Sequence, residues 1–285
     1  MENTKREQYH IRITSKPKLF DLEIGEFFRY KDLVRIFAKK EFDQRYRQTI
    51  LGPLWAFISP LMSSLMHMFV FGTIAKIGTN GIPQILFYLF SDNLWSLFSS
   101  SLGDNAYTLI ANTYLFSKVY FPRLVMPMSR TLLIFYRWLI RTVVSMPFYC
   151  YFLFQGEIQP RWWAVLVVPV ILVLFSMLGC GLGMIISSMT IKYRDLNMLV
   201  GFAMGIWMYV TPVVYPLSEL RETVMYRFAL INPLTGLMEL YRLAIFGMGD
   251  VLPWNLLYSV VVTVLAFGTG LVVFNRVEKS FVDTV

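Results

Sequence analysis

The feature that most constrains this chain is its set of long apolar stretches without charge. Lys, Arg, Asp and Glu are absent from residues 48–75, 162–191, 196–218 and 251–275. A helix of about 20 predominantly apolar residues is long enough to cross the hydrocarbon core of a bilayer. Each stretch reaches that length, so the sequence predicts a polytopic membrane protein rather than a soluble domain.

Two more segments are apolar but contain charged residues. These residues are Asp92, Asp104, Arg130, Arg137 and Arg141. With both segments included, the sequence predicts an all-α integral membrane fold with six transmembrane helices, at about 53–75, 84–112, 124–154, 163–189, 197–216 and 252–275. The transmembrane domain then covers residues 48–285 and follows a cytoplasmic N-terminal segment, residues 1–47.

Composition excludes several other classes of protein. Charged residues make up 15% of the chain, well below the roughly 25% of a soluble domain. The two cysteines, Cys150 and Cys180, are too few for a secreted disulfide scaffold. An aromatic content of 16% argues against intrinsic disorder. A cleavable signal peptide is not expected, because the first apolar stretch follows a long polar segment.

The basic residues are unevenly distributed along the chain. Twelve of the 26 lie before residue 48, among eight acidic residues and without a base-reading module, so nucleic-acid binding is not expected. If both termini are inside, the cytoplasmic segments hold eighteen Lys and Arg residues. The outside segments then hold five, namely Lys76, Arg161, Arg221, Arg227 and Arg242. The positive-inside rule therefore predicts that both termini are cytoplasmic.

The polar N-terminal segment contains a helical pattern. Apolar residues recur at helical spacing at Phe27, Tyr30, Val34 and Phe37. Basic residues four apart form another face at Lys31, Arg35 and Lys39. The pattern predicts an amphipathic interface helix in the headgroup plane. A soluble helix packed on a partner protein is the alternative.

Residues 217–250 are too many for a hairpin turn and too apolar for a solvated loop. The pairs Thr211-Pro212 and Asn232-Pro233 break helices in this part of the chain. Short re-entrant helices between spans five and six, buried against protein, fit this pattern. A small extracellular cap is the alternative.

Residues for catalysis are missing. No glycine is followed by lysine, so the chain has no P-loop for ATP hydrolysis. The two histidines, His10 and His67, cannot form a metal cluster or a catalytic relay with each other, and His67 is interpreted as a helix-packing residue with a backbone or hydroxyl partner. Asp92 and Asp104 lie about 120° apart around a helix and form no pair. The sequence therefore predicts that the chain is not an enzyme and that it does not bind a metal or a cofactor.

Three arginines of the third predicted span form one stripe. Arg130, Arg137 and Arg141 fall within about 40° of one another, over about 16 Å of helix. Charge inside a membrane normally has a partner or a water-filled path. One interpretation is a basic track for an anionic headgroup such as a pyrophosphate. The other is pairing with Asp104, which we expect for Arg130 and leave open for the other two.

Small and aromatic residues recur in the predicted spans. Close packing faces for neighbouring helices are expected at Gly179, Gly181 and Gly183, and at Gly201 and Gly205. Aromatic residues at or within the spans include Trp55, Phe57, Tyr88, Trp95, Trp207, Tyr209 and Tyr215. Most are expected at the bilayer interfaces, and stacking on sugar rings is the alternative.

Several segments resemble those of polysaccharide-type ABC-2 permeases. Residues 46–55 read YRQTILGPLW and are similar to the start of that family's first span. Residues 117–123 (SKVYFPR) resemble its loop between spans two and three, and residues 192–195 (KYRD) its loop between spans four and five. Residues 211–216 (TPVVYP) and 232–236 (NPLTG) resemble two further elements, so the matches run in order along the chain.

The resemblance implies the membrane subunit of an ATP-driven exporter of undecaprenyl-linked polysaccharide in the bacterial cytoplasmic (inner) membrane. The glycan would be O antigen, teichoic acid or a rhamnose-rich polymer. Members of the family are homodimers bound to two copies of a separate nucleotide-binding subunit, which holds ATP and Mg²⁺. Their fold, the ABC-2 or type V exporter fold, has an interface helix, six spans, a coupling helix and re-entrant helices.

The resemblance also implies roles for individual residues. The ATPase would push on the loop after span two, at Tyr114, Phe116, Lys118, Tyr120 and Phe121. Four exposed aromatics there suit a socket on a partner, and anchoring in the headgroup layer is the alternative. The dimer would open a channel between facing spans one and five, lined by Trp55, Phe69, Trp207, Tyr209 and Tyr215. Arg45 and Arg47 would meet the lipid pyrophosphate or, alternatively, serve as topology anchors.

Two other functions remain open at this point. An integral-membrane transferase acting on polyprenyl-linked sugars would need clustered carboxylates or a metal site near one interface. An ABC-2 permease for small lipophilic compounds would share the fold but not the sugar-exporter motifs. The sequence names neither the glycan nor its length.

Overall fold

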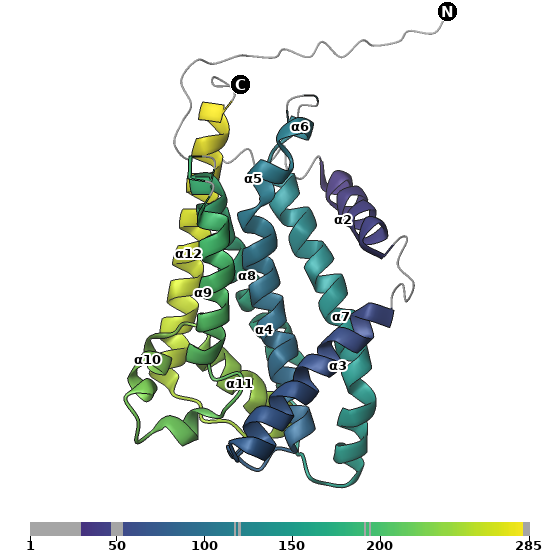
Figure 1. The fold of residues 1–285 in the computed structure, drawn as a ribbon, viewed down its shortest axis with the longest axis vertical. Coiled ribbons are helices and arrows are strands. Elements are labelled where there is room, and N and C mark those ends of the chain that lie inside the picture. The colour runs from purple at the N-terminus through teal and green to yellow at the C-terminus, as the bar shows by residue number, and fades with distance from the viewer. Residues whose placement is uncertain are drawn as a thin grey trace, which may run out of the picture.

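The computed structural model describes residues 30–46, 54–116, 118, 121–190, 192–193 and 195–281. Within these ranges, the side chains of residues 45–46, 56–57, 113, 116 and 277–281 are left out of the description. All regular elements in the described part of the chain are helices. They form an elongated bundle in which α8 (Ala164–Thr190) packs against both α4 (Gln84–Ala106) and α12 (Pro253–Phe281) (Figure 1).

The other long helices surround this centre. They are α3 (Trp55–His67), α7 (Val125–Phe154) and α9 (Leu196–Val210). The chain of α3 continues into the π-helix η2 (Met68–Ile74), and α3 packs against α4 and α7 (Figure 1). Helices therefore lie at all six predicted apolar segments. The fifth is shorter than predicted, because Thr211-Pro212 ends α9 at Val210.

Length and apolarity single out two of the described helices as candidate membrane spans. These are α8 and the Pro253–Arg276 part of α12. The helical stretches Ile58–Ile74 and Leu196–Val210 are apolar but shorter.

Glycines allow the close packing of α8. A Cβ atom at Gly179 would lie 2.7 Å from the carbonyl oxygen of Phe98 in α4, and one at Gly181 would lie 2.6 Å from Cα of Phe267 in α12. Gly179 and Gly181 thus serve opposite faces of α8, whereas one shared face was predicted. The expectation for Gly201 and Gly205 is wrong within the described chain, because a Cβ atom at either would meet nothing within 4 Å.

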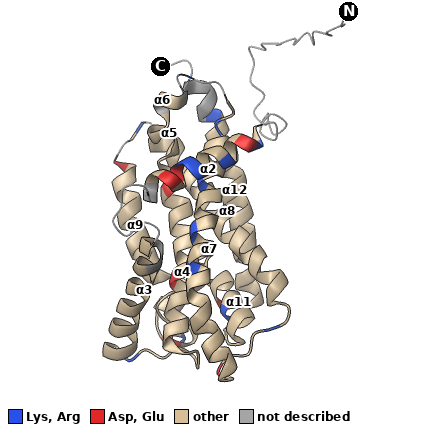
Figure 2. Ribbon diagram, turned by 90° about the vertical axis from the view of Figure 1, so that its right-hand side faces the viewer, with Lys and Arg blue, Asp and Glu red and all other residues tan. Residues whose placement is uncertain are grey.

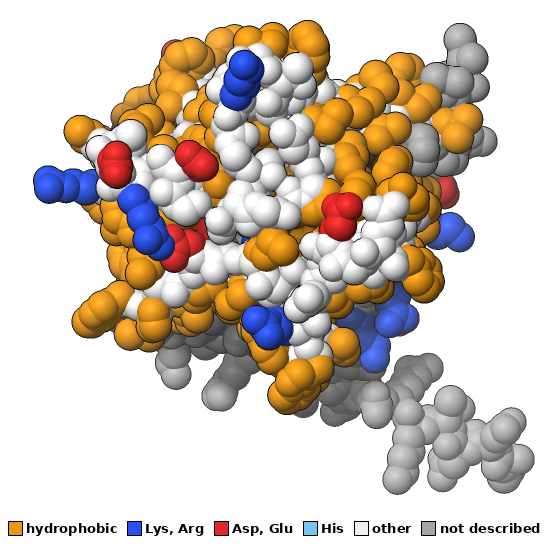
Figure 3. Space-filling model, turned by 90° about the horizontal axis from the view of Figure 1, so that it is seen from below, with side chains coloured by type: hydrophobic (Ala, Val, Ile, Leu, Met, Phe, Trp, Pro, Cys, Tyr) orange, Lys and Arg blue, Asp and Glu red, His pale blue; other side chains and the backbone are white. Residues whose placement is uncertain are grey.

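One end of the bundle, called here the α11 end, holds three short helices. They are η3 (Leu217–Leu220), α10 (Met225–Ile231) and α11 (Thr235–Phe246). Asn232-Pro233 separates α10 from α11, as predicted, and Gly247 ends α11 with a φ of 79°. Figure 3 shows hydrophobic side chains around much of the rim of this end, and charged side chains both on its face and at its edges. Because α11 packs against α8 and α12, it is part of the bundle rather than a separate cap.

The opposite end, called here the α2 end, carries α2 (Lys31–Tyr46), α5 (Thr108–Ala111) and α6 (Thr113–Phe116). A helix lies where the N-terminal pattern predicted one, and Phe27 of that pattern lies outside the described residues. Leu33, Val34 and Phe37 of α2, with Tyr30 just before it, pack on Phe121, Val125 and Met126, and α2 lies against the start of α7. Its basic residues Lys31, Arg35 and Lys39 are exposed. Figure 2 shows charge concentrated on α2, with a few charged positions along α7 and α4 inside the tan body.

Candidate functional site

A buried carboxylate joins the first long helix to the second. The Ser64 hydroxyl donates a hydrogen bond of 2.9 Å to Asp92, and Nδ1 of His67 lies 2.9 Å from both carboxylate oxygens. Asp92 is 8% exposed. The expectation of a backbone or hydroxyl partner for His67 is therefore wrong, because the antiparallel packing of α3 on α4 places it opposite a carboxylate.

The predicted arginine stripe lies along the seam between α4 and α7. The guanidinium of Arg137 forms the ion pair with Asp104, whereas Arg130 donates to the backbone carbonyl of Asp104. Pairing with Asp104 is thus confirmed for the stripe, but its carboxylate partner is Arg137 and not Arg130. Arg137 and Arg141 line a pocket on this seam, with Trp138 beside them. We call it the α4–α7 pocket.

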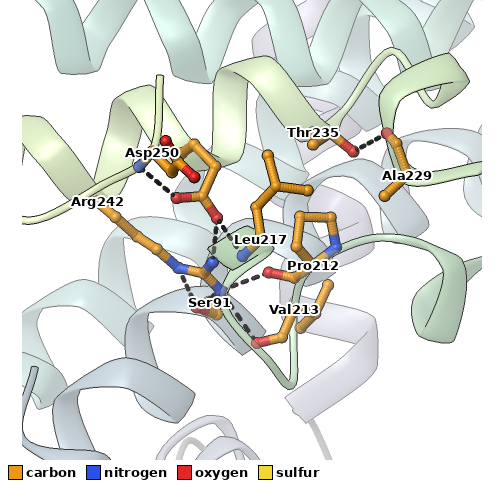
Figure 4. A network of polar contacts seen from close by, with 9 residues as sticks. Ser91, Pro212, Val213, Leu217, Ala229, Thr235, Arg242 and Asp250 are labelled. Atoms are coloured by element: carbon orange, nitrogen blue, oxygen red, sulfur yellow. Dashed lines mark hydrogen bonds and ion pairs between the residues drawn. The ribbon is translucent and has the colours of Figure 1, made fainter. Parts of the chain in front are cut away.

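A second arginine–carboxylate pair lies at the α11 end and is fully buried. Arg242 donates to Glu239 over 2.7 Å, and the two side chains are 2% and 1% exposed. The same guanidinium donates to Ser91 of α4 at 2.9 Å and to the carbonyl groups of Pro212 and Val213, as Figure 4 shows. The sequence analysis counted Arg242 among the basic residues of the outside segments, and its burial and its pairing with Glu239 were not predicted.

The Glu239 carboxylate also has hydrogen-bond partners besides Arg242. Glu239 accepts hydrogen bonds from the backbone N–H groups of Leu217 at 3.3 Å and Asp250 at 2.9 Å. The Arg242 guanidinium also lies 4.1 Å from the ring centroid of Phe87. The network joins α4, the segment after α9, η3 and α11, so it fixes the whole α11 end. The only signal in the sequence is a Glu and an Arg three residues apart in an apolar stretch.

Asn232 adds a second link between α9 and the short helices. Its side-chain nitrogen donates to Thr211 at 2.7 Å, and its oxygen accepts from Nε1 of Trp207 at 3.2 Å. Thr235 donates to the Ala229 carbonyl at 2.6 Å and closes the turn (Figure 4). The two motifs, TPVVYP and NPLTG, thus meet in space.

One exposed ion pair lies outside the helical core at the α11 end. Arg221 pairs with Asp250, and this carboxylate raises the pKa of the guanidinium by hydrogen bonding and charge attraction. The exposure of the pair limits its contribution to stability.

The residues predicted to line a glycan path fall into two groups. Trp55 and Phe69 on the first span and Tyr209 on α9 are 48 to 55% exposed. Trp207 and Tyr215 are partly buried and packed within the chain, Trp207 on Phe98 with ring centroids 5.1 Å apart. Tyr215 donates to the Tyr209 carbonyl. Three of the five residues are therefore exposed and two are partly buried, and Tyr209 also lies beside the first span, with its ring centroid 6.2 Å from that of Phe71.

The residues predicted to contact the ATPase at the α2 end also fall into an exposed group and a buried group. Tyr114 is 71% exposed, and the ammonium of Lys118 lies 4.0 Å from its ring centroid. Phe121 is only 5% exposed and lies 5.8 Å from Phe37 of α2, so the expectation of an exposed aromatic there is wrong. Tyr120, Arg47 and the side chains of Phe116 and Arg45 lie outside the described residues.

Among the described residues, no group of three or more His, Cys, Asp and Glu side chains is placed to hold a metal ion. The chemistry that the described part offers is thus of another kind. It consists of paired charges between helices, one basic pocket, and exposed apolar faces on α3 and α9.

Comparison with known proteins agrees with this arrangement. The chain is 28% identical over 269 residues to the O-antigen export system permease protein RfbA of Myxococcus xanthus, covering 92% of this chain and 98% of that protein. It is 26% identical to a protein of the same name from Klebsiella pneumoniae, covering 88% and 94% of the two chains. The profile of the ABC-2 type transporter family matches residues 32–246, from α2 through α11. The chain therefore belongs to the ABC-2 type transporter family of membrane proteins.

Proposed function

We propose that the chain is the permease subunit of an ABC exporter that moves undecaprenyl-linked polysaccharide across the bacterial cytoplasmic membrane. The observation that carries the proposal is the match to O-antigen export permeases over 94% or more of their length. The matches cover nearly all of this chain as well, so they include both the α2 end and the α11 end.

All six long helical segments would cross the membrane. The charges of α4 and α7 do not oppose this, because Asp92 bonds to Ser64 and His67, and Asp104 bonds to Arg137. Buried partners lower the cost of charge inside a bilayer. Both termini would face the cytoplasm, together with α2, and the α11 end would face outward.

The channel would form between two copies of the chain. The outward faces of α3 and α9 are apolar and have no partner among the described residues, with Met66 62% and Phe202 72% exposed. Placing α3 of one copy against α9 of the other would cover both faces. Trp55, Phe69 and Tyr209 would then lie at this junction and contact the glycan.

Energy would come from two copies of a separate ABC ATPase, which binds the ATP and Mg²⁺. Tyr114 and Lys118 offer an exposed contact at the α2 end. Phe121 would act indirectly, because it joins α2 to the start of α7 and lets both move together. Arg45 and Arg47 would meet the lipid pyrophosphate on the same side.

The two alternative functions would each need a different feature in the chain. A transferase acting on polyprenyl-linked sugars needs an acid–base or metal site, and a permease for small lipophilic compounds needs no long polymer path. Neither function is favoured by a specific contact in the described part of the chain.

Co-purification with the ATPase encoded beside this chain tests the proposal. The chain alone should hydrolyse no ATP, and the complex should hydrolyse it. Tyr114→Ala should lower ATPase recovery severalfold at unchanged melting temperature, because buried aromatic anchors dominate interface energetics. Tyr136→Ala, a matched change of an exposed tyrosine on α7, should leave recovery unchanged. ATP turnover by the chain alone, or equal recovery with both variants, would contradict the proposal.

A further inference from the structure

The first span changes helix type at His67. Residues Trp55–His67 form the α-helix α3, and Met68–Ile74 form the π-helix η2. The backbone N–H of Ala75 accordingly donates to the carbonyl of Val70, five residues earlier, at 2.9 Å. A π-helix is rare and mostly lasts a single turn, often at a functional site. A π-helix of seven residues therefore needs specific contacts that favour it over the α-helix.

The first of these contacts lies where the helix type changes. Ser64 and His67 lie three residues apart on one face of α3, and both bond to the Asp92 carboxylate of α4 at 2.9 Å. Asp92 is buried, and hydrogen bonds to an ionised carboxylate are roughly twice as strong as those between neutral groups. We call Ser64, His67 and Asp92 the Asp92 cluster. It fixes the start of η2 against α4.

The spacing of the residues that face α4 follows the helix type. After His67 the next fully buried residue is Gly72, five positions later, and a Cβ atom there would lie 2.8 Å from the side-chain oxygen of Gln84 in α4. An α-helix would instead place residues three and four positions after His67 on that face, and the fourth is Phe71. The π-helix thus places a glycine where an α-helix would place an aromatic ring.

The ring of Phe71 contacts α9 in the structure, with its centroid 6.2 Å from that of Tyr209. If η2 were α-helical, Phe71 and Ile74 would both face α4, because they lie four and seven positions after His67. The ring would then need the space between η2 and α4 that Gly72 leaves narrow, so the first span would have to move away from α4. That movement breaks the Asp92 cluster. The helix type of η2 and the Asp92 cluster are therefore linked.

We propose that η2 is a two-state segment of the first span, π-helical while the Asp92 cluster is intact and α-helical when it is broken. The change turns Ile74, now 63% exposed, toward α4 and ends the contact between Phe71 and Tyr209. A partner on the outward face of the first span meets different side chains in the two states, so its binding shifts the balance between them. In the proposed function this partner is a second copy or the glycan, and that assignment alone rests on the proposed function.

Disulfide cross-linking in the purified full-length chain tests the proposal without ATP or the ATPase. The reporter pair is Ile74→Cys with Gln84→Cys, and the matched pair is Thr73→Cys with Gln84→Cys. Both are made in a chain whose own Cys150 and Cys180 are replaced by alanine. Chains of single mass are isolated after oxidation, which removes links between two copies.

Trypsin cleaves after Lys76, so each link joins two peptides that mass spectrometry counts. The test variant is the double change His67→Leu with Asp92→Asn, which removes the Asp92 cluster without leaving a buried charge unpaired. The control is His67→Asn, whose amide nitrogen takes the place of Nδ1 and keeps the hydrogen bond to Asp92.

The reporter pair should link at least threefold more in the double change than in the wild type, and at the wild-type level in the control. The matched pair should not gain, because an α-helix turns Thr73 away from α4. Equal linkage of the reporter pair in the wild type and the double change overturns the proposal. So does an equal gain for both pairs, which shows loosening without a change of helix type. Either result leaves the export function standing, because that function is measured with the ATPase.

Discussion

The neighbouring helices α8 and α9 are both apolar, but they are used in opposite ways. Thirteen of the 27 residues of α8 are buried, and none of the 15 residues of α9 is. Gly181 of α8 touches the backbone of α12, whereas Gly205 of α9 faces open space. The buried face of α8 is covered by α4 and α12, whereas most of α9 is left uncovered by the described part of the chain.

This difference shows where the chain is fixed and where it is free to bind. The frame consists of α4, α8, α11 and α12, held by close helix contacts and by the Arg242–Glu239 pair. The outward faces of α3 and α9 have no such support. The frame attaches α9 mainly near its end, where Trp207 and Thr211 bond to Asn232.

The largest effect is expected from Arg242→Met. The change leaves the Glu239 carboxylate buried without its partner and frees the segment after α9. Breaking a buried ion pair by removing one partner costs about 3–5 kcal/mol, so most of the protein should fail to fold. The yield of monodisperse protein and its melting temperature measure this.

Arg221→Gln is the control for that change, because it removes an exposed ion pair at the same end of the bundle. Its expected cost is about 0–1 kcal/mol. Similar losses of stability in Arg242→Met and Arg221→Gln would show that the buried Arg242–Glu239 network does not stabilise the frame.

The next effect is expected from Phe121→Ala at the α2 end. Helix α2 is intermediate between α8 and α9, with one face bound to the chain and one exposed. Removing the buried ring should cost about 3 kcal/mol, mostly as release of α2. Limited trypsin digestion at Lys39 and Lys40 should then become faster, while the melting temperature of the bundle falls little.

Equal digestion of the Phe121→Ala variant and the wild type would contradict the docking of α2. The matched variant Tyr114→Ala changes an exposed aromatic of the same end and should leave digestion unchanged.

A smaller effect is expected from a glycine-to-alanine substitution made once in α8 and once in α9. Gly181→Ala places a methyl group 2.6 Å from Phe267 Cα and should cost about 1–3 kcal/mol by overpacking. Gly205→Ala meets nothing in the chain and should change stability by less than about 0.5 kcal/mol. Chemical denaturation in detergent measures the stability of both variants. Equal losses of stability would show that α8 and α9 do not differ in how closely they pack within the chain.

The positions of the helices were predictable from the sequence, because the signals are local. Charge-free runs mark four of the long helical segments, and apolar runs with a few charges mark α4 and α7. Thr211-Pro212 and Asn232-Pro233 mark the breaks around the short helices. The apolar face of α2 was also readable, since Tyr30, Val34 and Phe37 recur at helical spacing.

The pairing between helices was not predictable, because it depends on their register and rotation. The sequence gives no sign that Asp92 meets His67, or that Arg137 rather than Arg130 takes the Asp104 carboxylate. Equally, Gly181 and Gly205 look alike until α12 is placed beside one of them. The exposed position assigned to Phe121 failed for the same reason, since α2 covers it.

The central claim is that this chain carries a lipid-linked polysaccharide across the membrane and does not synthesise it. The most direct measurement follows the polymer in cells depleted of the chain, with surface and internal pools separated. The account predicts that the surface polymer disappears while undecaprenyl-linked polymer accumulates inside. Unchanged surface polymer, or loss of the internal lipid-linked polymer as expected for a missing transferase, would contradict it.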